Sequence, residues 1–307
     1  METHLKNPPL VMAGLVLGLF ALGNLLEAYS PLLRYVLGAV GMLLWGLLIK
    51  GMISHPESFR SQLTQPLIAS VFTTFFMTGM IFSSYVMLFA SFGTWVTILA
   101  KTIWWLSFVG IVLFMINFCR KYLLHFSMDN VFPSWTVLYV GIGVASLTAA
   151  ISHQFLLGQI VFWYGLVATL LVLPIVCYKG YKIGLDEATK PNLTTICAPM
   201  SLITAGYAST FETPNKTLLV LLIILSQLLY FFILAQLPKL MGRKFSPGFS
   251  AFTFPLVISA TSLKLSVQVL GLTGFWLTLI NVECLIAAIV VFMVLSGYLN
   301  YLKQADK

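Results

Sequence analysis

The sequence predicts an all-α integral membrane protein with ten transmembrane helices. Two features of its composition support this fold class: of the 307 residues, 59% are hydrophobic and only 8% are charged. A soluble domain carries roughly 25% charged residues. In addition, apolar runs of about 20 residues, the length that crosses a bilayer, recur along the whole chain. We expect residues 1–307 to form a single transmembrane domain, because no polar stretch is long enough to form a second one.

The apolar runs define ten expected spans. They cover residues 9–28, 32–52, 66–89, 92–118, 133–151, 155–177, 192–211, 217–240, 248–270 and 273–300. Two of the links, around residues 91–93 and 271–273, are tight turns rather than polar loops. No signal-peptide pattern precedes the first span, so we expect that span to remain in the mature protein.

The basic residues indicate how the spans are oriented. The net charge is +8, and the 17 Lys and Arg residues fall in short links between apolar runs instead of a patch that would suit nucleic acid. Only Arg34 and Lys216 lie on one side of the expected bilayer, and Lys101 and Lys264 fall inside spans. The rest lie on the other side, which the positive-inside rule makes cytoplasmic. Both termini are therefore expected in the cytoplasm, as an even number of spans requires.

Prolines mark a repeat of helical hairpins. Each odd-numbered span begins near a proline on the cytoplasmic side, at Pro9, Pro66, Pro133, Pro191 and Pro247. Proline suits the first turn of a helix, where its missing N–H would have no partner in any case. The alternative is that prolines simply mark helix starts. Taken as a repeat, they predict five hairpins, with the odd helices around a central pore and the even helices facing lipid.

The odd-numbered spans are also rich in small and hydroxyl residues. Such residues allow close helix packing or line a polar path, and ordinary packing remains open for any one of them. The candidates for pore-lining positions are Gly14, Gly18, Thr73, Thr74, Gly141, Gly143, Pro199, Ser201, Phe252 and Pro255. By contrast, residues 218–234 are almost wholly aliphatic and aromatic, as a lipid-facing helix should be.

The ninth span begins Pro-Gly-Phe-Ser-Ala-Phe-Thr-Phe-Pro at residues 247–255. This run resembles the signature of the tellurite-resistance/C4-dicarboxylate transporter family, which includes the slow-type anion channels of plant guard cells. In that family a small-Phe/Tyr-Ser/Thr-Phe-Pro/Gly motif begins the ninth helix, and the second aromatic of this motif plugs the pore. Residues 251–255 match the motif, so the resemblance assigns this role to Phe254. The Gly14 and Gly18 stretch and the Ala198-Pro199 pair are also similar to the family's pattern, although the chain has fewer mid-span prolines than the family often has.

The resemblance implies a function and an assembly. It implies a channel or uniporter for small inorganic or organic anions, in a homotrimer within the plasma membrane, each subunit having its own pore. The alternative is a proton- or ion-coupled exporter of dicarboxylates or tellurite-related anions on the same fold. The sequence shows no convergent catalytic set, so we expect no enzyme activity, and no metal or cofactor. The expected partners are small anions and the lipid bilayer.

Three charged residues lie well inside expected spans, where charge is costly and often functional. These are Lys101, Lys264 and Glu283. Lys264 lies near the outer end of the ninth span, where it either concentrates anions or extends to the membrane interface. Lys101 and Glu283 lie at similar depth, so one hypothesis pairs them as ions. The other gives Glu283 a role in proton coupling.

Overall fold

The computed structural model describes residues 7–303, and all regular structure in this range is helical. Lys6 and Lys307, two of the predicted cytoplasmic charges, lie outside the described residues. Seven helices in the described range are long and apolar enough to cross a membrane. They are α2 (Pro31–Ser54), α4 (Pro66–Met87), α5 with its continuation (Thr94–Leu123), α9 with its continuation (Phe155–Ile183), α11 (Lys216–Leu234), η8 with α13 (Pro247–Leu270) and α14 (Phe275–Lys303).

The other three expected spans correspond to shorter or interrupted helical segments. The first is η1 (Leu10–Met12) with α1 (Ala13–Leu26). The expected fifth span begins with α6 (Trp135–Val140), which a 3₁₀ turn, η5 (Gly141–Gly143), separates from α7 (Val144–Leu147) and α8 (Ala149–Ser152). The seventh span starts as a 3₁₀ helix, η7 (Lys190–Cys197), and becomes α10 (Ala198–Thr210). The described residues thus contain seven long apolar helices, and the other three expected spans are shorter or interrupted.

Two short helices are additional to the long ones: α3 (Pro56–Leu63) lies in the link between the second and third expected spans, and α12 (Leu237–Met241) lies at the end of the expected eighth span, 217–240. Pro56 starts α3, and α12 follows α11. At the start of the spans, Pro66 and Pro247 stand in the first turn of α4 and of η8 (Pro247–Phe252), as the proline repeat predicts for a helix start. Gly271 ends α13 (Thr253–Leu270) in the left-handed conformation at φ 65°, which glycine adopts without a steric penalty.

Burial separates the long helices into two sets. About two thirds of the apolar window is buried in α4 and in η8 with α13 (67% each), whereas the windows of the other five are only 22–39% buried. Almost every residue of α1, α6 and α10 is also buried. The chain thus has buried elements that alternate along the sequence with helices exposing apolar side chains, which is how lipid-facing helices behave.

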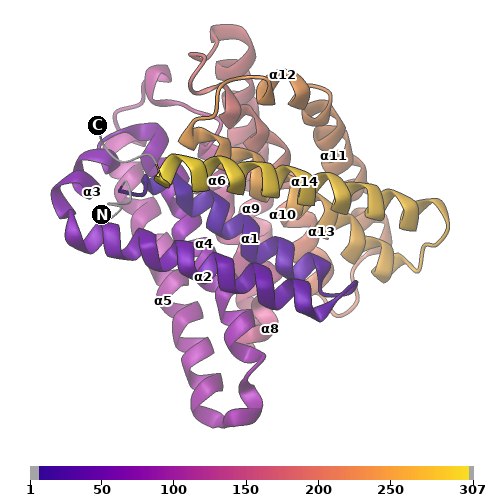
Figure 1. Cartoon of the computed structure of the whole chain (residues 1–307). Helices are drawn as coiled ribbons and strands as arrows, with labels where there is room; N and C mark the ends of the chain where they lie inside the picture. Colours follow the sequence, from indigo (N-terminus) through magenta and orange to yellow (C-terminus); the bar gives the residue numbers. More distant parts are fainter. Residues whose placement is uncertain (1–6, 304–307) are drawn as a thin grey trace.

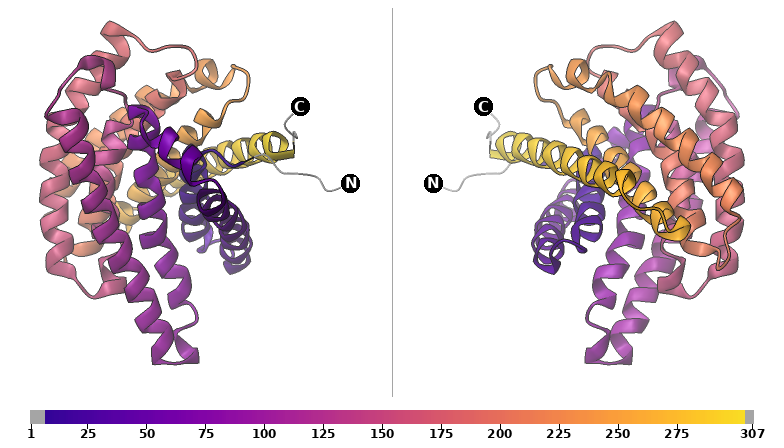
Figure 2. Two further views of the ribbon diagram at one scale, coloured as in Figure 1. Left: turned by 90° about the vertical axis from the view of Figure 1, so that its left-hand side faces the viewer. Right: turned by 90° about the vertical axis from the view of Figure 1, so that its right-hand side faces the viewer.

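Each exposed helix packs on the buried element before it in the sequence. The contacts join α1 to α2, α4 to α5 (Thr94–Phe118), α6 to α9 (Phe155–Tyr178), α10 to α11 and α13 to α14. The helices are not all parallel: α14 and the α1–α2 pair cross the α4–α5 pair, whose linked ends extend beyond the rest of the molecule (Figure 1). The same extension is visible in both side views (Figure 2).

The buried elements contact one another in a cyclic order. α1 packs on α4, α4 on α6, α6 and α7 on α10, α10 on α13, and α13 on α1. Segments far apart in the sequence are thereby brought together, the first and last buried elements among them.

Candidate functional site

A cavity of about 270 Å³ lies where the buried elements meet. Its wall includes residues from α1, α4, the α7–α8 region, α10 and α13, so each of the five buried segments contributes to it. The polar side chains in the wall are few: Asn24, Ser84, Thr148, Ser209, Thr261 and Lys264. The remaining lining is mainly aliphatic, and it includes Phe254. The cavity is therefore weakly polar and has one basic group.

Phe254 owes its position to the residue before it. The Thr253 hydroxyl donates hydrogen bonds to the carbonyl oxygens of Gly14 (2.9 Å) and Ser250 (2.8 Å), which fastens the start of α13 to α1. Gly18 has no side chain to obstruct this contact, and an added Cβ would lie 2.6 Å from Cβ of Thr253. With Thr253 directed at α1, the next residue, Phe254, lines the cavity and is 4% exposed.

The other two predicted residues of this run have different surroundings. Phe252 is fully buried and packs edge-on against Phe249, with ring centroids 5.0 Å apart, and it does not line the cavity. Pro255 lies in the first turn of α13, where a missing N–H costs little. Of the phenylalanines at positions 249, 252 and 254, only Phe254 thus lines the cavity.

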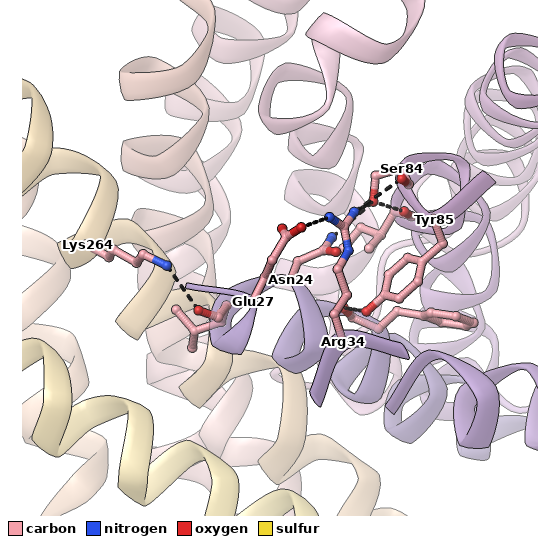
Figure 3. Close-up of polar contacts among 9 residues, drawn as sticks. Asn24, Glu27, Arg34, Ser84, Tyr85 and Lys264 are labelled. Atoms are coloured by element: carbon pink, nitrogen blue, oxygen red, sulfur yellow. Dashed lines mark hydrogen bonds and ion pairs between the residues drawn. The ribbon is translucent and has the colours of Figure 1, made fainter. Parts of the chain in front are cut away.

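Lys264 lines the same cavity ten residues further along α13. Its Nζ donates to the carbonyl oxygen of Leu25 at 3.0 Å (Figure 3). Leu25 lies in the last turn of α1, where carbonyl groups have no partner within the helix and attract cations. The lysine is consequently held by a neutral acceptor and has no ion-pair partner among the described residues.

A polar network that the sequence analysis did not assign to the site lies beside this cavity. Arg34, at the start of α2, forms an ion pair with Glu27 at 2.6 Å and donates to the Ser84 carbonyl oxygen at 3.1 Å (Figure 3). Asn24 donates to the Ser84 hydroxyl at 3.1 Å, and the Arg34 guanidinium lies 4.9 Å from the centre of the Tyr85 ring. The only signal in the sequence was that Glu27 and Arg34 flank one tight turn. Their charges cancel, which leaves Lys264 as the basic group of the cavity wall without an acidic partner.

None of the ten predicted pore-lining residues lines this cavity, and four of them are instead involved in packing within or between helices. The hydroxyls of Thr73 and Thr74 each donate at 2.7 Å to a carbonyl oxygen of their own helix, three residues earlier. An added Cβ at Gly141 would lie 2.7 Å from the Met77 sulfur, and one at Gly143 would lie 3.3 Å from Leu202. Gly141 and Gly143 thus allow close approach at the 3₁₀ turn.

Pro199 and Ser201 lie in the first turn of α10, beside α13. Pro199 stands where the 3₁₀ segment η7 gives way to α-helix. The Ser201 hydroxyl shares a 2.9 Å hydrogen bond with Ser259 of α13, and Ser259 in turn donates to the Pro255 carbonyl oxygen at 2.9 Å. A buried hydroxyl pair therefore ties α10 to α13 about one turn beyond Phe254.

The hypothesis of an ion pair between Lys101 and Glu283 does not agree with the structure. Lys101 is half-buried on α5, which packs on α4, whereas Glu283 lies on α14, which packs on α13 and α1. No ion pair joins them within residues 7–303. Similar depth in the membrane did not predict contact, because the two helices pack on different buried elements. Glu283 is instead 1% exposed, with both carboxyl oxygens buried and unpaired.

Comparison of the sequence with known protein families assigns the chain to one of them. Residues 8–299, nearly the whole chain, match the sequence model of the SLAC1 family, whose description is voltage-dependent anion channel. No curated protein sequence matches the chain.

Proposed function

Since this chain belongs to the voltage-dependent anion channel family and is a multi-pass membrane protein that transports anions, we propose that it is a channel or uniporter gated by Phe254. The proposed path runs between α1, α4, α6 to α8, α10 and α13. The observation that carries the proposal is the cavity to which these segments all contribute, with Phe254 in its wall.

The arrangement of the helices supports a path at this position. The buried elements contact one another in a cyclic order, and the exposed helices pack outside them. A bulky aromatic in a narrow apolar passage closes it by excluding water, which ions require. We propose that five hairpins surround the passage in this way. Gly14 and Gly18 contribute by allowing α1 to approach the segment that carries Phe254.

The chemistry of the cavity supports small anions as the substrate. Lys264 supplies a positive potential, and the Asn24 amide and nearby hydroxyls supply weak hydrogen-bond donors. An anion must bind well enough to enter and weakly enough to leave. One lysine and a few neutral donors meet both requirements better than a cluster of arginines would.

A proton-coupled exporter of dicarboxylates is the second candidate. The observation that favours it is Glu283, a carboxyl that is buried and unpaired within an apolar helix. A pH gradient would then be required for transport. Anion flux in proteoliposomes that persists without a pH gradient would instead favour the channel.

We also propose that the protein assembles as a homotrimer in the plasma membrane, each subunit with its own path. The family resemblance supports this assembly. Native mass spectrometry of the detergent-solubilised protein tests it, and a mass that corresponds only to the monomer would contradict the trimer.

The deciding experiment for the gate substitutes Phe254→Ala and records anion currents in planar bilayers. We expect a conductance increase of at least tenfold, because the ring that closes the passage is gone. The matched control is Phe252→Ala, which removes the same ring two residues earlier, away from the cavity. Its conductance should stay near that of the unmodified protein. Equal currents in Phe254→Ala and the unmodified protein, with both variants monodisperse, would exclude the gate.

A further inference from the structure

Glu283 is buried on α14 in surroundings that offer no compensating charge. Its exposed fraction is 1%, and neither carboxyl oxygen has a hydrogen-bond partner. Within the described residues, none of the ion pairs includes it. An ionised carboxyl without a partner is among the most costly groups to place inside a membrane protein, so such residues usually have a function.

The side-chain amide of Gln227, on the neighbouring helix α11, lies next to this carboxyl. Gln227 is buried as well, and both its Nε2 and its Oε1 lack a hydrogen-bond partner. Two polar side chains from two helices that both pack on α13 therefore lie next to each other, and the polar atoms of both lack hydrogen-bond partners.

A single proton would satisfy both side chains. With a proton on one carboxyl oxygen, Glu283 donates to Oε1 of Gln227, and Nε2 of Gln227 donates to the other carboxyl oxygen. The ionised form has no hydrogen to donate, so Oε1 of Gln227 would face a negative charge unpaired. Leaving a buried acceptor unsatisfied costs about 1–3 kcal/mol, and more beside a charge.

We propose that Glu283 of α14 and Gln227 of α11 form a site that binds and releases a proton. Both helices pack on α13, the helix that carries Phe254. An exchangeable proton, and not a lysine or arginine side chain of the protein, neutralises the carboxyl group at this site. The site does not depend on the proposed function, because proton binding here follows from the two side chains alone.

The other titratable groups around the site do not replace the proton. Tyr230 on α11 is buried and its hydroxyl also has no partner, and the thiols of Cys197 and Cys284 are buried. On α13 the charged group is Lys264, whose Nζ is held by the Leu25 carbonyl oxygen. Beyond the end of α1, Glu27 is already paired with Arg34.

Infrared difference spectroscopy of the full chain in lipid measures the site directly. We expect a carboxylic acid C=O band that disappears on alkaline titration and is absent from Glu283→Gln. Glu27→Gln, which alters an ion-paired carboxylate, should leave the band in place. The exchange of the pair, Gln227→Glu with Glu283→Gln, should restore a titrating band, because it rebuilds the acid–amide pair with its members swapped.

Two results would overturn the proposal. One is a spectrum in which no protonated carboxyl is lost in Glu283→Gln at any pH. The other is a band that changes on replacing Na⁺ with K⁺ at fixed pH, which would make the site a cation site. Anion flux measured on the same samples separates the two proposals: a Glu283 band without flux supports the proton site and contradicts the anion path.

Discussion

Gly18 of α1 and Thr253 of α13 approach so closely that a methyl group on Gly18 would lie 2.6 Å from Cβ of Thr253. Real Cβ atoms do not come this near to other atoms. The contact sits one residue before Phe254, at the point where α13 begins. The separation of these two helices therefore fixes the position of the proposed gate.

The substitution Gly18→Ala should force α1 and α13 apart. Overpacking of this kind costs about 1–3 kcal/mol, so we expect a lower midpoint in thermal unfolding followed by fluorescence. The control is Gly46→Ala on α2, where nothing lies within 4 Å of an added Cβ. There alanine should be neutral or stabilising, since it favours a helix over glycine. An unchanged midpoint in Gly18→Ala would show that the contact is loose.

Substituting Lys264→Gln should weaken the entry of anions. The side chain keeps a polar end but loses the charge that attracts anions to the cavity, so conductance at low anion concentration should fall several-fold. The difference from the unmodified protein should shrink at high ionic strength, because salt screens the charge. Currents measured over a range of salt concentrations test this, with Lys264→Arg as the charge-retaining control. A loss that is independent of salt would argue for a packing role instead.

Arg34→Gln should destabilise the end of the molecule near the α1–α2 turn. It leaves Glu27 without its cation and removes a donor to Ser84. Glu27 is 43% exposed and partly screened by water, so we expect a loss of about 1 kcal/mol rather than the larger cost of a fully buried pair. Thermal unfolding with Glu27→Gln and the double substitution gives the coupling energy. Strictly additive effects would mean that the pair contributes nothing.

The loop before η7 should respond to acid through Glu187. Hydrogen bonds from Lys190, and then from Arg243, lower the pKa of the Glu187 carboxyl from its ordinary value of 4.5. A group with a lowered pKa stabilises the folded form above its ordinary pKa and loses that contribution as the pH falls through the lowered value. We therefore expect faster hydrogen exchange of residues 184–190, corrected for intrinsic rates, only at strongly acidic pH. Glu187→Gln should remove the pH dependence, and a transition near neutral pH would contradict the assignment.

Much of the fold follows from patterns in the sequence, because in a membrane the apolar lengths and the positions of prolines have direct physical causes. The start of α4 at Pro66 and the end of α13 at Gly271 could be predicted from residue type alone. The interruption at Gly141–Gly143 could not. Glycine in a membrane helix is compatible with a close contact or a break, and this segment has both, a 3₁₀ turn and the close approach of Met77 to Gly141.

The site was less predictable than the fold. The position of Phe254 could be predicted through a family signature, but its surroundings depend on which segments meet at the cavity. Arg34 was assigned only as an outer charge, because its link to Ser84 joins residues 50 positions apart. The partner proposed for Glu283 was the wrong residue for the same reason. Depth in the membrane can be counted along a helix, but the sequence does not show which helices are neighbours.

Phe254 and Lys264 lie on one continuous helix, α13. The proposed gate and the basic group proposed to attract anions are therefore mechanically connected. Ten residues of helix separate the Cα atoms of Phe254 and Lys264 by about 15 Å along the axis, with no break between them. A rotation of α13 that moves the Phe254 ring out of the proposed passage would also displace Lys264 relative to the Leu25 carbonyl oxygen that it contacts. Lys264 would then be able to bind an incoming anion only while the Phe254 ring is out of the passage. Anion binding and the opening of the passage would result from the same movement of α13.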